Sequence, residues 1–121
     1  DDEQTKATIK KVFDKYSYLC DSHTAVAVKV YEDYKAQTGD QTKTIIASTA
    51  SPFKFAGSVL EAVTGEKSNE DEFKQIQTLG KISGMEVPKQ LAELESKEIR
   101  FTTSVPADKM PQTVLESLAI K

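Results

Sequence analysis

Residues 44–55 read TIIASTASPFKF, an apolar run that stops in small hydroxylated residues and then continues as the start of a helix. The β-branched pair Ile45 and Ile46 favours a strand over residues 43–48. A buried strand of this kind places polar groups at its carboxyl end, where open α/β sheets bind their ligands. The stretch therefore predicts an α/β protein with a site just beyond this strand.

The polar residues that follow the strand have two interpretations. Ser48 and Thr49 lie at its expected end, Ser51 is a good helix N-cap, and Pro52 suits the first helical position, where its missing N–H costs nothing. A helix N-terminus after small hydroxylated residues also favours an anion, which Lys54 would help to neutralise. No glycine-rich phosphate loop accompanies it. Helix capping by Ser51 explains most of the pattern.

Apolar residues at helical spacing and capping signals predict six helices. They are expected over residues 3–16, from Asp21 or Ser22 to Gly39, from Pro52 to Gly65, after a capping box of Asn69 and Glu72, after Pro88, and from a start near Pro111. Alternation over residues 99–105 predicts a second strand, half-buried or at an edge. Its inward face would carry Ile99, Phe101, Thr103 and Val105.

Strands that alternate with helices predict one α/β domain over residues 1–121, with a small, mainly parallel sheet covered by helices. Two or three strands make a thin sheet with exposed edges. The first residue is Asp1 rather than methionine. Both features indicate a piece of a longer polypeptide.

Composition argues against several classes of function. The net charge is −3 with both signs interspersed, and Arg100 is the only arginine, which disfavours a nucleic-acid surface. No apolar run has the length of a signal peptide or a membrane span. Cys20 is the only cysteine, so no disulfide forms within the chain and a cytoplasmic location is expected.

Residues 19–25 gather the only cysteine and the only histidine at a helix start. Activation of Cys20 by His23 would make a nucleophile. The better-supported interpretation is that Asp21 or Ser22 caps the helix and Cys20 is buried as a small apolar side chain. A structural zinc site generally needs four cysteine or histidine ligands, and this chain has only Cys20 and His23, so no metal is expected.

Together, residues 19–26 (LCDSHTAV) and 48–55 (STASPFKF) resemble the C-terminal region of threonine synthase, a pyridoxal-phosphate enzyme. The first stretch is similar to the family's Asp-Pro-His-Thr-Ala motif, with Ser22 in place of the proline. The second is similar to its Ser-Thr-Ala-x-Pro-x-Lys-Phe motif. The ending from Val105 to Asp108, followed by a helix, also resembles the family's C-terminus. The resemblance covers essentially this whole chain, but only the last quarter of such an enzyme.

The resemblance implies part of the large domain of a tryptophan-synthase-like, fold type II enzyme. The reaction it implies converts O-phospho-L-homoserine and water into L-threonine and phosphate. The implied cofactor contact is Thr49 to the pyridine nitrogen of pyridoxal phosphate, with Ser48 beside it. The residues that would line the site are Asp21, His23, Thr24 and Lys54.

The Schiff-base lysine and the phosphate loop of the family lie upstream of the matching region. Lys54 belongs to the second motif and is not that lysine. The isolated segment is therefore expected to be inactive, to need the N-terminal remainder of the enzyme, and to self-associate when that part is absent. Two alternatives stay open: a stand-alone α/β binding or interaction module, and a segment of another tryptophan-synthase-like enzyme. The histidine motif favours threonine synthase over the latter.

Overall fold

A computed structural model describes residues 1–120, and every regular element in that range is helical. The elements are α1 (Asp2–Tyr16), α2 (Ser22–Thr38), the 3-10 turn η1 (Pro52–Phe55), α3 (Ala56–Thr64), α4 (Glu72–Ser83), α5 (Lys89–Ala92), the 3-10 turns η2 (Glu93–Ser96) and η3 (Ala107–Lys109), and α6 (Met110–Ser117). The expected α/β sheet, and with it the likeness to a fold type II large domain, is wrong for this part of the chain.

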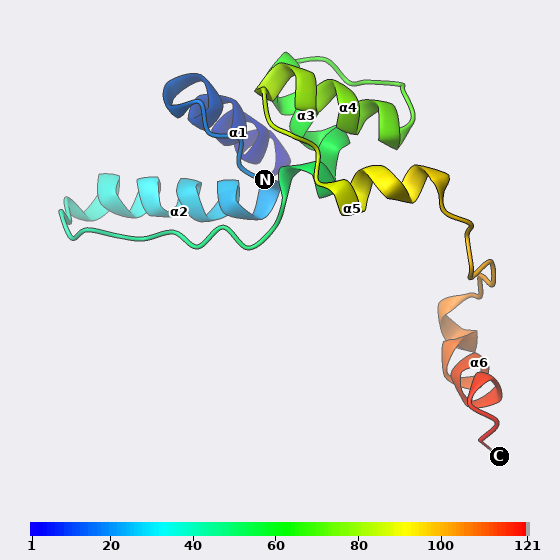
Figure 1. Ribbon diagram of the computed structural model, residues 1–121. Coiled ribbons are helices and arrows are strands. Elements are labelled where there is room, and N and C mark those ends of the chain that lie inside the picture. Colours follow the sequence, from blue (N-terminus) through cyan, green and yellow to red (C-terminus); the bar gives the residue numbers. More distant parts are fainter. Residues whose placement is uncertain (121) are drawn as a thin grey trace.

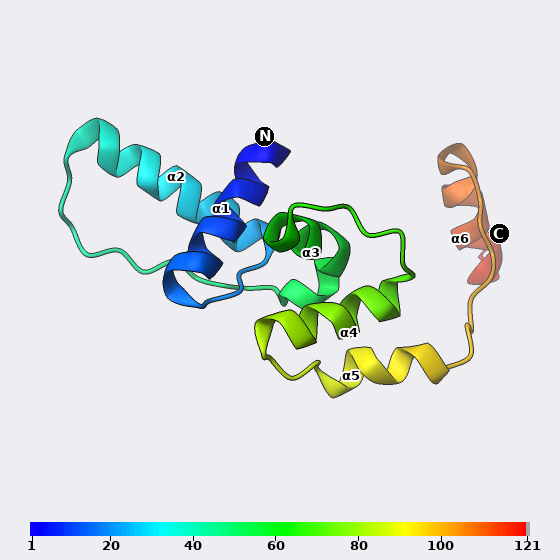
Figure 2. The ribbon, with the colours of Figure 1, turned by 90° about the horizontal axis from the view of Figure 1, so that it is seen from above.

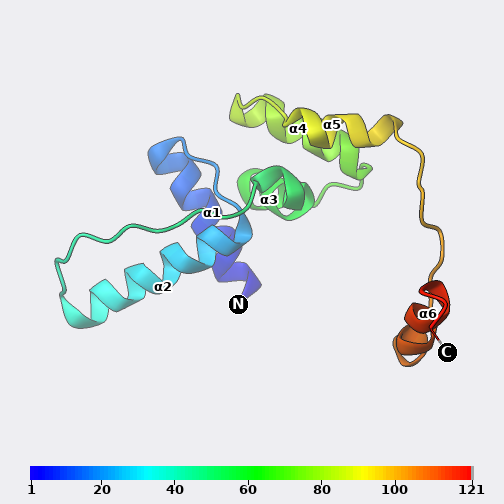
Figure 3. The same ribbon diagram turned by 60° about the horizontal axis from the view of Figure 1, so that its bottom comes forward.

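Four helices form the body of the molecule. Helix α1 packs against α2 and α3, and α3 packs against α4 (Figures 1 and 2). The buried apolar side chains come mostly from α3, with contributions from α1, the α1–α2 loop, α2, η1 and α4. They are Ile9, Val12, Leu19, Cys20, Ala25, Phe53, Ala56, Val59, Leu60, Ala62, Val63 and Leu79. Helix α6 stands apart from this body at the end of an extended arm (Figure 3).

The helix boundaries largely follow the capping signals of the sequence. Asp21 caps α2, and Gly39 ends it in the left-handed conformation at φ 69°, which glycine adopts without steric cost. Gly65 ends α3 in the same way. The expected capping box at the start of α4 is wrong, because the Asp71 carboxylate caps this helix by accepting from the two N–H groups that follow.

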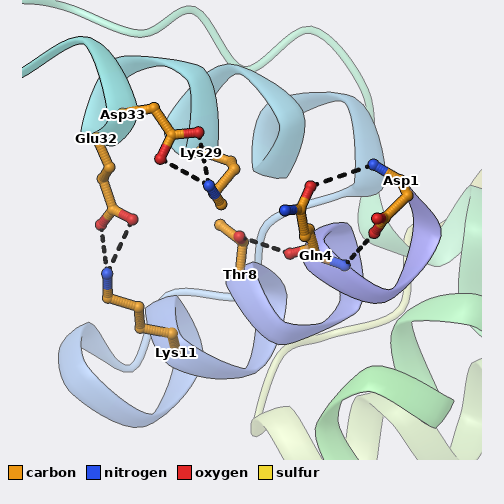
Figure 4. A network of polar contacts seen from close by, with 7 residues as sticks. All are labelled: Asp1, Gln4, Thr8, Lys11, Lys29, Glu32 and Asp33. Atoms are coloured by element: carbon orange, nitrogen blue, oxygen red, sulfur yellow. Dashed lines mark hydrogen bonds and ion pairs between the residues drawn. The ribbon is translucent and has the colours of Figure 1, made fainter. Parts of the chain in front are cut away.

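Polar contacts fix the ends and faces of α1 and α2 (Figure 4). Asp1 and Gln4 form a capping box at the start of α1. Between the helices, Lys11 Nζ lies 2.7 Å from a carboxylate oxygen of Glu32. Exposed ion pairs of this kind contribute at most about 1 kcal/mol, so the apolar core supplies most of the packing energy.

The two expected strands are extended chain without a sheet. Neither residues 43–48 nor residues 99–105 make a backbone hydrogen bond within residues 1–120. The β-branched pair in the first segment and the alternation in the second predict extended backbone, but a strand also needs a neighbouring strand with which to form hydrogen bonds. The inward face expected for the second segment is wrong as well, since Ile99 is 77% exposed and Phe101 83% exposed.

Residues 39–51 run back along α2 towards its N-terminus (Figure 1). This return path leaves an open, mainly apolar groove between the helix and the extended segment, lined by Ala27, Val30, Tyr31, Tyr34, Thr44, Ile45, Ile46 and Ala47. The same path brings Ser48 to the start of α2, where the candidate site lies.

Candidate functional site

Asp21 is the centre of the site at the N-terminus of α2. Its side chain is completely buried, which is rare for a carboxylate unless donors surround it. Oδ1 accepts from the backbone N–H of His23 at 2.9 Å and of Thr24 at 3.3 Å, and Oδ2 accepts from the Thr24 hydroxyl. The predicted N-cap is therefore confirmed, with Asp21 as the capping residue.

These donors keep Asp21 ionised. Burial by itself raises the pKa of the carboxyl, but the hydrogen bonds from the Thr24 hydroxyl, the two backbone N–H groups and the His23 ring outweigh it. The net result is a pKa below the ordinary value of 3.8. A full negative charge therefore sits beneath the first turn of α2, where the helix dipole stabilises it.

Thr24 joins the two motifs. Its hydroxyl oxygen lies 3.0 Å from the Ser48 hydroxyl oxygen, across 24 residues of sequence. Because the single Thr24 hydroxyl proton already goes to Asp21, the Ser48 hydroxyl is the donor in this contact. Asp21, Thr24 and Ser48 thus form one chain of hydrogen bonds that fixes the end of the extended segment to the start of α2.

The His23 ring lies over this network and is held from two sides. Its Nδ1 is 3.2 Å from Asp21 Oδ1, and its ring centroid is 5.0 Å from that of Phe55, with the two planes tilted by 54°. The side chain is 66% exposed, so the far edge of the ring faces solvent. This arrangement fixes the ring while leaving one edge accessible.

The remaining residues expected at the site are less constrained. Thr49 and Lys54 are both exposed, and the Thr49 hydroxyl makes no hydrogen bond within residues 1–120. Ser51 caps η1 by accepting from the N–H of Phe53, and Pro52 occupies the first turn as expected. Thr49 therefore lies between two anchored residues, Ser48 and Ser51, with its own hydroxyl free.

Sequence reasoning missed the role of Phe55. This aromatic residue ends the second motif and packs on the single histidine of the first. Its side chain also borders a small pocket between η1, α3 and α4. The pairing of the two motifs indicated that they lie close together, but neither periodicity nor capping indicates that the His23 ring contacts the Phe55 ring.

Cys20 does not serve as a nucleophile in this arrangement. Its side chain is 1% exposed in the apolar core, and burial raises the pKa of its thiol. No cluster of three potential metal-binding side chains occurs within residues 1–120. No helix in the same range has the length and apolarity needed to cross a membrane.

A comparison with protein families completes the description of the site. The family model described as "Threonine synthase, C-terminal" matches residues 24–114, three quarters of the chain. The match contains Thr24, Ser48, Thr49 and Lys54, and begins just after Asp21 and His23. The chain belongs to the threonine synthase C-terminal family.

Proposed function

We propose that this chain is the C-terminal part of an enzyme that converts O-phospho-L-homoserine and water into L-threonine and phosphate, using pyridoxal phosphate. The observation that carries the proposal is the hydrogen-bonded chain from Asp21 through Thr24 to Ser48. It brings the two motifs, far apart in sequence, to one place. A pattern shared by chance would give no reason for the motifs to meet.

The residues present fit one edge of the cofactor. The free Thr49 hydroxyl is a suitable partner for a pyridine nitrogen, and the Ser48 contact holds the backbone beside it in place. A neutral hydroxyl, unlike a carboxylate, does not enforce protonation of that nitrogen. When bound, pyridoxal phosphate supplies electron withdrawal from the carbon atoms of an amino-acid substrate. The exposed Lys54 supplies a positive charge for an anionic group nearby.

The surface of the chain supports the proposal that it works with the N-terminal remainder of the enzyme. Large apolar side chains are exposed along α2 and the extended segment, including Val30 at 62% and Ile45 at 92%. Contiguous apolar surface of this kind marks an interaction site. In the isolated chain the same surface favours self-association, so the apparent mass in sedimentation should rise with concentration. Adding the remainder should replace these self-associated species by one complex of the chain and the remainder, whose mass no longer rises with concentration.

Substitution of Thr49 tests the cofactor contact in an enzyme that carries this segment as its C-terminal part. Thr49→Val removes the hydroxyl at nearly constant volume and should lower turnover about 10- to 100-fold. Thr49→Ser keeps the hydroxyl and should retain activity. Thr102→Val makes the same chemical change in the other extended segment, at an exposed residue outside both motifs and outside the groove, and should leave turnover unchanged. Full activity of Thr49→Val would refute the contact.

The isolated chain offers a second test. With pyridoxal phosphate and O-phospho-L-homoserine it should release no phosphate, and borohydride should fix the cofactor to no single lysine. Phosphate release that depends on adding the N-terminal remainder would support the assignment. Stable attachment of the cofactor to one lysine of this chain would show that the site is complete without that remainder.

A further inference from the structure

We propose that Asp21 holds the His23 imidazole with its proton on Nδ1, which leaves the Nε2 lone pair exposed as the proton acceptor for the water that adds to the substrate. The inference rests on the proposed function for its chemistry. Its structural part, the tautomer of His23, stands on the geometry of this chain alone.

The tautomer follows from the chemistry of the carboxylate. An ionised carboxylate only accepts hydrogen bonds, so the ring nitrogen 3.2 Å from Asp21 Oδ1 carries the hydrogen. A neutral imidazole has one N–H group, and its other nitrogen then bears a lone pair. In His23 that nitrogen is Nε2, which makes no hydrogen bond within residues 1–120.

Helix capping alone does not account for this arrangement. Asp71 caps α4 through the same two backbone positions, its side chain is 54% exposed, and the residue equivalent to His23 is Phe73, whose ring has no nitrogen to orient. Asp21 makes the same cap while fully buried, and in addition contacts an imidazole ring that also packs against Phe55. The additional contacts orient an imidazole, which a helix cap does not require.

The proton transfer involves only the water, the His23 imidazole and the released phosphate. The Nε2 lone pair forms a new N–H bond, the O–H bond of the water breaks, and its electron pair stays on the oxygen that attacks the substrate. The imidazolium so formed lies beside the ionised Asp21, whose charge stabilises it, as in other carboxylate–histidine pairs. The ring then returns the proton to the phosphate that the reaction releases. His23 carries the proton, and Asp21 is its positioning residue.

Nitrogen-15 NMR of this chain tests the tautomer directly, because His23 is the only histidine. In alkaline buffer, Nδ1 should show a one-bond coupling to hydrogen and Nε2 the chemical shift of an unprotonated nitrogen. The reverse assignment in the unmodified chain would overturn the proposal without any variant. Neither cofactor nor substrate is present, so this result is independent of the proposed function.

Two matched variants identify the cause. Asp21→Ser keeps a side-chain cap for α2 but removes the partner of the ring, so the proton should move largely to Nε2. Asp71→Ser makes the same change at α4 and should leave the His23 signals unchanged. A folded Asp21→Ser chain with an unaltered tautomer would contradict the positioning role. If this variant does not fold, Asp21→Asn keeps a neutral acceptor and should show a reduced Nδ1–H population.

Kinetics of the enzyme that carries this segment test the proton transfer. His23→Gln keeps a polar side chain of similar length that takes no proton, and should lower kcat about 100-fold or more with little change in KM. An unchanged kcat would overturn the role of His23 as proton acceptor. If the unmodified enzyme releases no phosphate from O-phospho-L-homoserine, the proposed function fails instead.

Discussion

Replacing Ile9 and Ile45 by alanine, one at a time, makes the same chemical change in two opposite environments. Ile9 is 1% exposed on the inner face of α1, whereas Ile45 is 92% exposed in the extended segment beside α2. Any difference between the two variants therefore reports burial rather than chemistry. The comparison tests whether the core and the open groove are assigned correctly.

The expected magnitudes follow from the packing. Ile9→Ala removes the three side-chain carbons beyond Cβ from the core, at about 0.8 kcal/mol for each buried carbon, and leaves a cavity. The better helix propensity of alanine offsets about 0.4 kcal/mol of this loss. The free energy of unfolding should fall by about 2–4 kcal/mol. Ile45→Ala should change it by no more than about 0.5 kcal/mol.

Urea unfolding followed by far-ultraviolet circular dichroism measures both changes. With a slope of about 2 kcal/mol per molar urea, the midpoint should fall by about 1–2 M for Ile9→Ala and hardly move for Ile45→Ala. Equal losses in the two variants would refute the assigned core. Dilute protein is needed for this comparison, because self-association through the exposed apolar surface would make the loss for Ile45→Ala depend on concentration.

Three further predictions concern titration, reactivity and the C-terminal arm. The folded-state pKa of Asp21 is lowered, so its contribution to stability is complete above the ordinary pKa of 3.8 and is lost as the pH falls through the folded-state value. Asp21→Asn should therefore reduce the fall of the urea midpoint with decreasing pH in this acid range. The Cys20 thiol should react with a thiol reagent in the folded chain only as fast as the core opens, and quickly in urea, because it is buried with a raised pKa. Deletion of the chain after Ser96 should change the free energy of unfolding by less than about 0.5 kcal/mol, because the arm supplies no residue to the buried core; a loss of several kcal/mol would contradict that.

The local parts of the fold could be predicted from the sequence. The boundaries of α2 follow from Asp21 at its start and Gly39 at its end, and both signals act within a single turn of helix. Whether the two extended segments would form a sheet could not be predicted. A strand depends on hydrogen bonds to a partner strand, and that partner can lie anywhere in a chain. Residues 43–48 have the β-branched pair of a strand and residues 99–105 its alternation, and within residues 1–120 each lacks a neighbouring strand.

The site could be predicted in part, for a related reason. The resemblance assigned Thr24 and Ser48 to one cofactor site, and in the structure their hydroxyl groups share a hydrogen bond. The cofactor site itself stays a prediction. The contact between His23 and Phe55 was missed, because it depends on how η1 turns after Ser51. Capping signals locate a turn along the chain, but they do not say which side chains of two turns will touch.

The cap of α2 explains how the polar contacts of Asp21 form in this chain while its apolar groove is open to solvent. The donors that Asp21 receives come from its own first helical turn, so the buried carboxylate needs no distant segment to stay ionised. Through Thr24 this locally formed group binds Ser48, and through Nδ1 it orients His23. Contacts within residues 1–120 therefore order these side chains before any substrate binds. Under the proposed function, the N-terminal remainder of the enzyme supplies the cover for the apolar groove and the reactive lysine, while Thr49 and the exposed edge of His23 come from this chain.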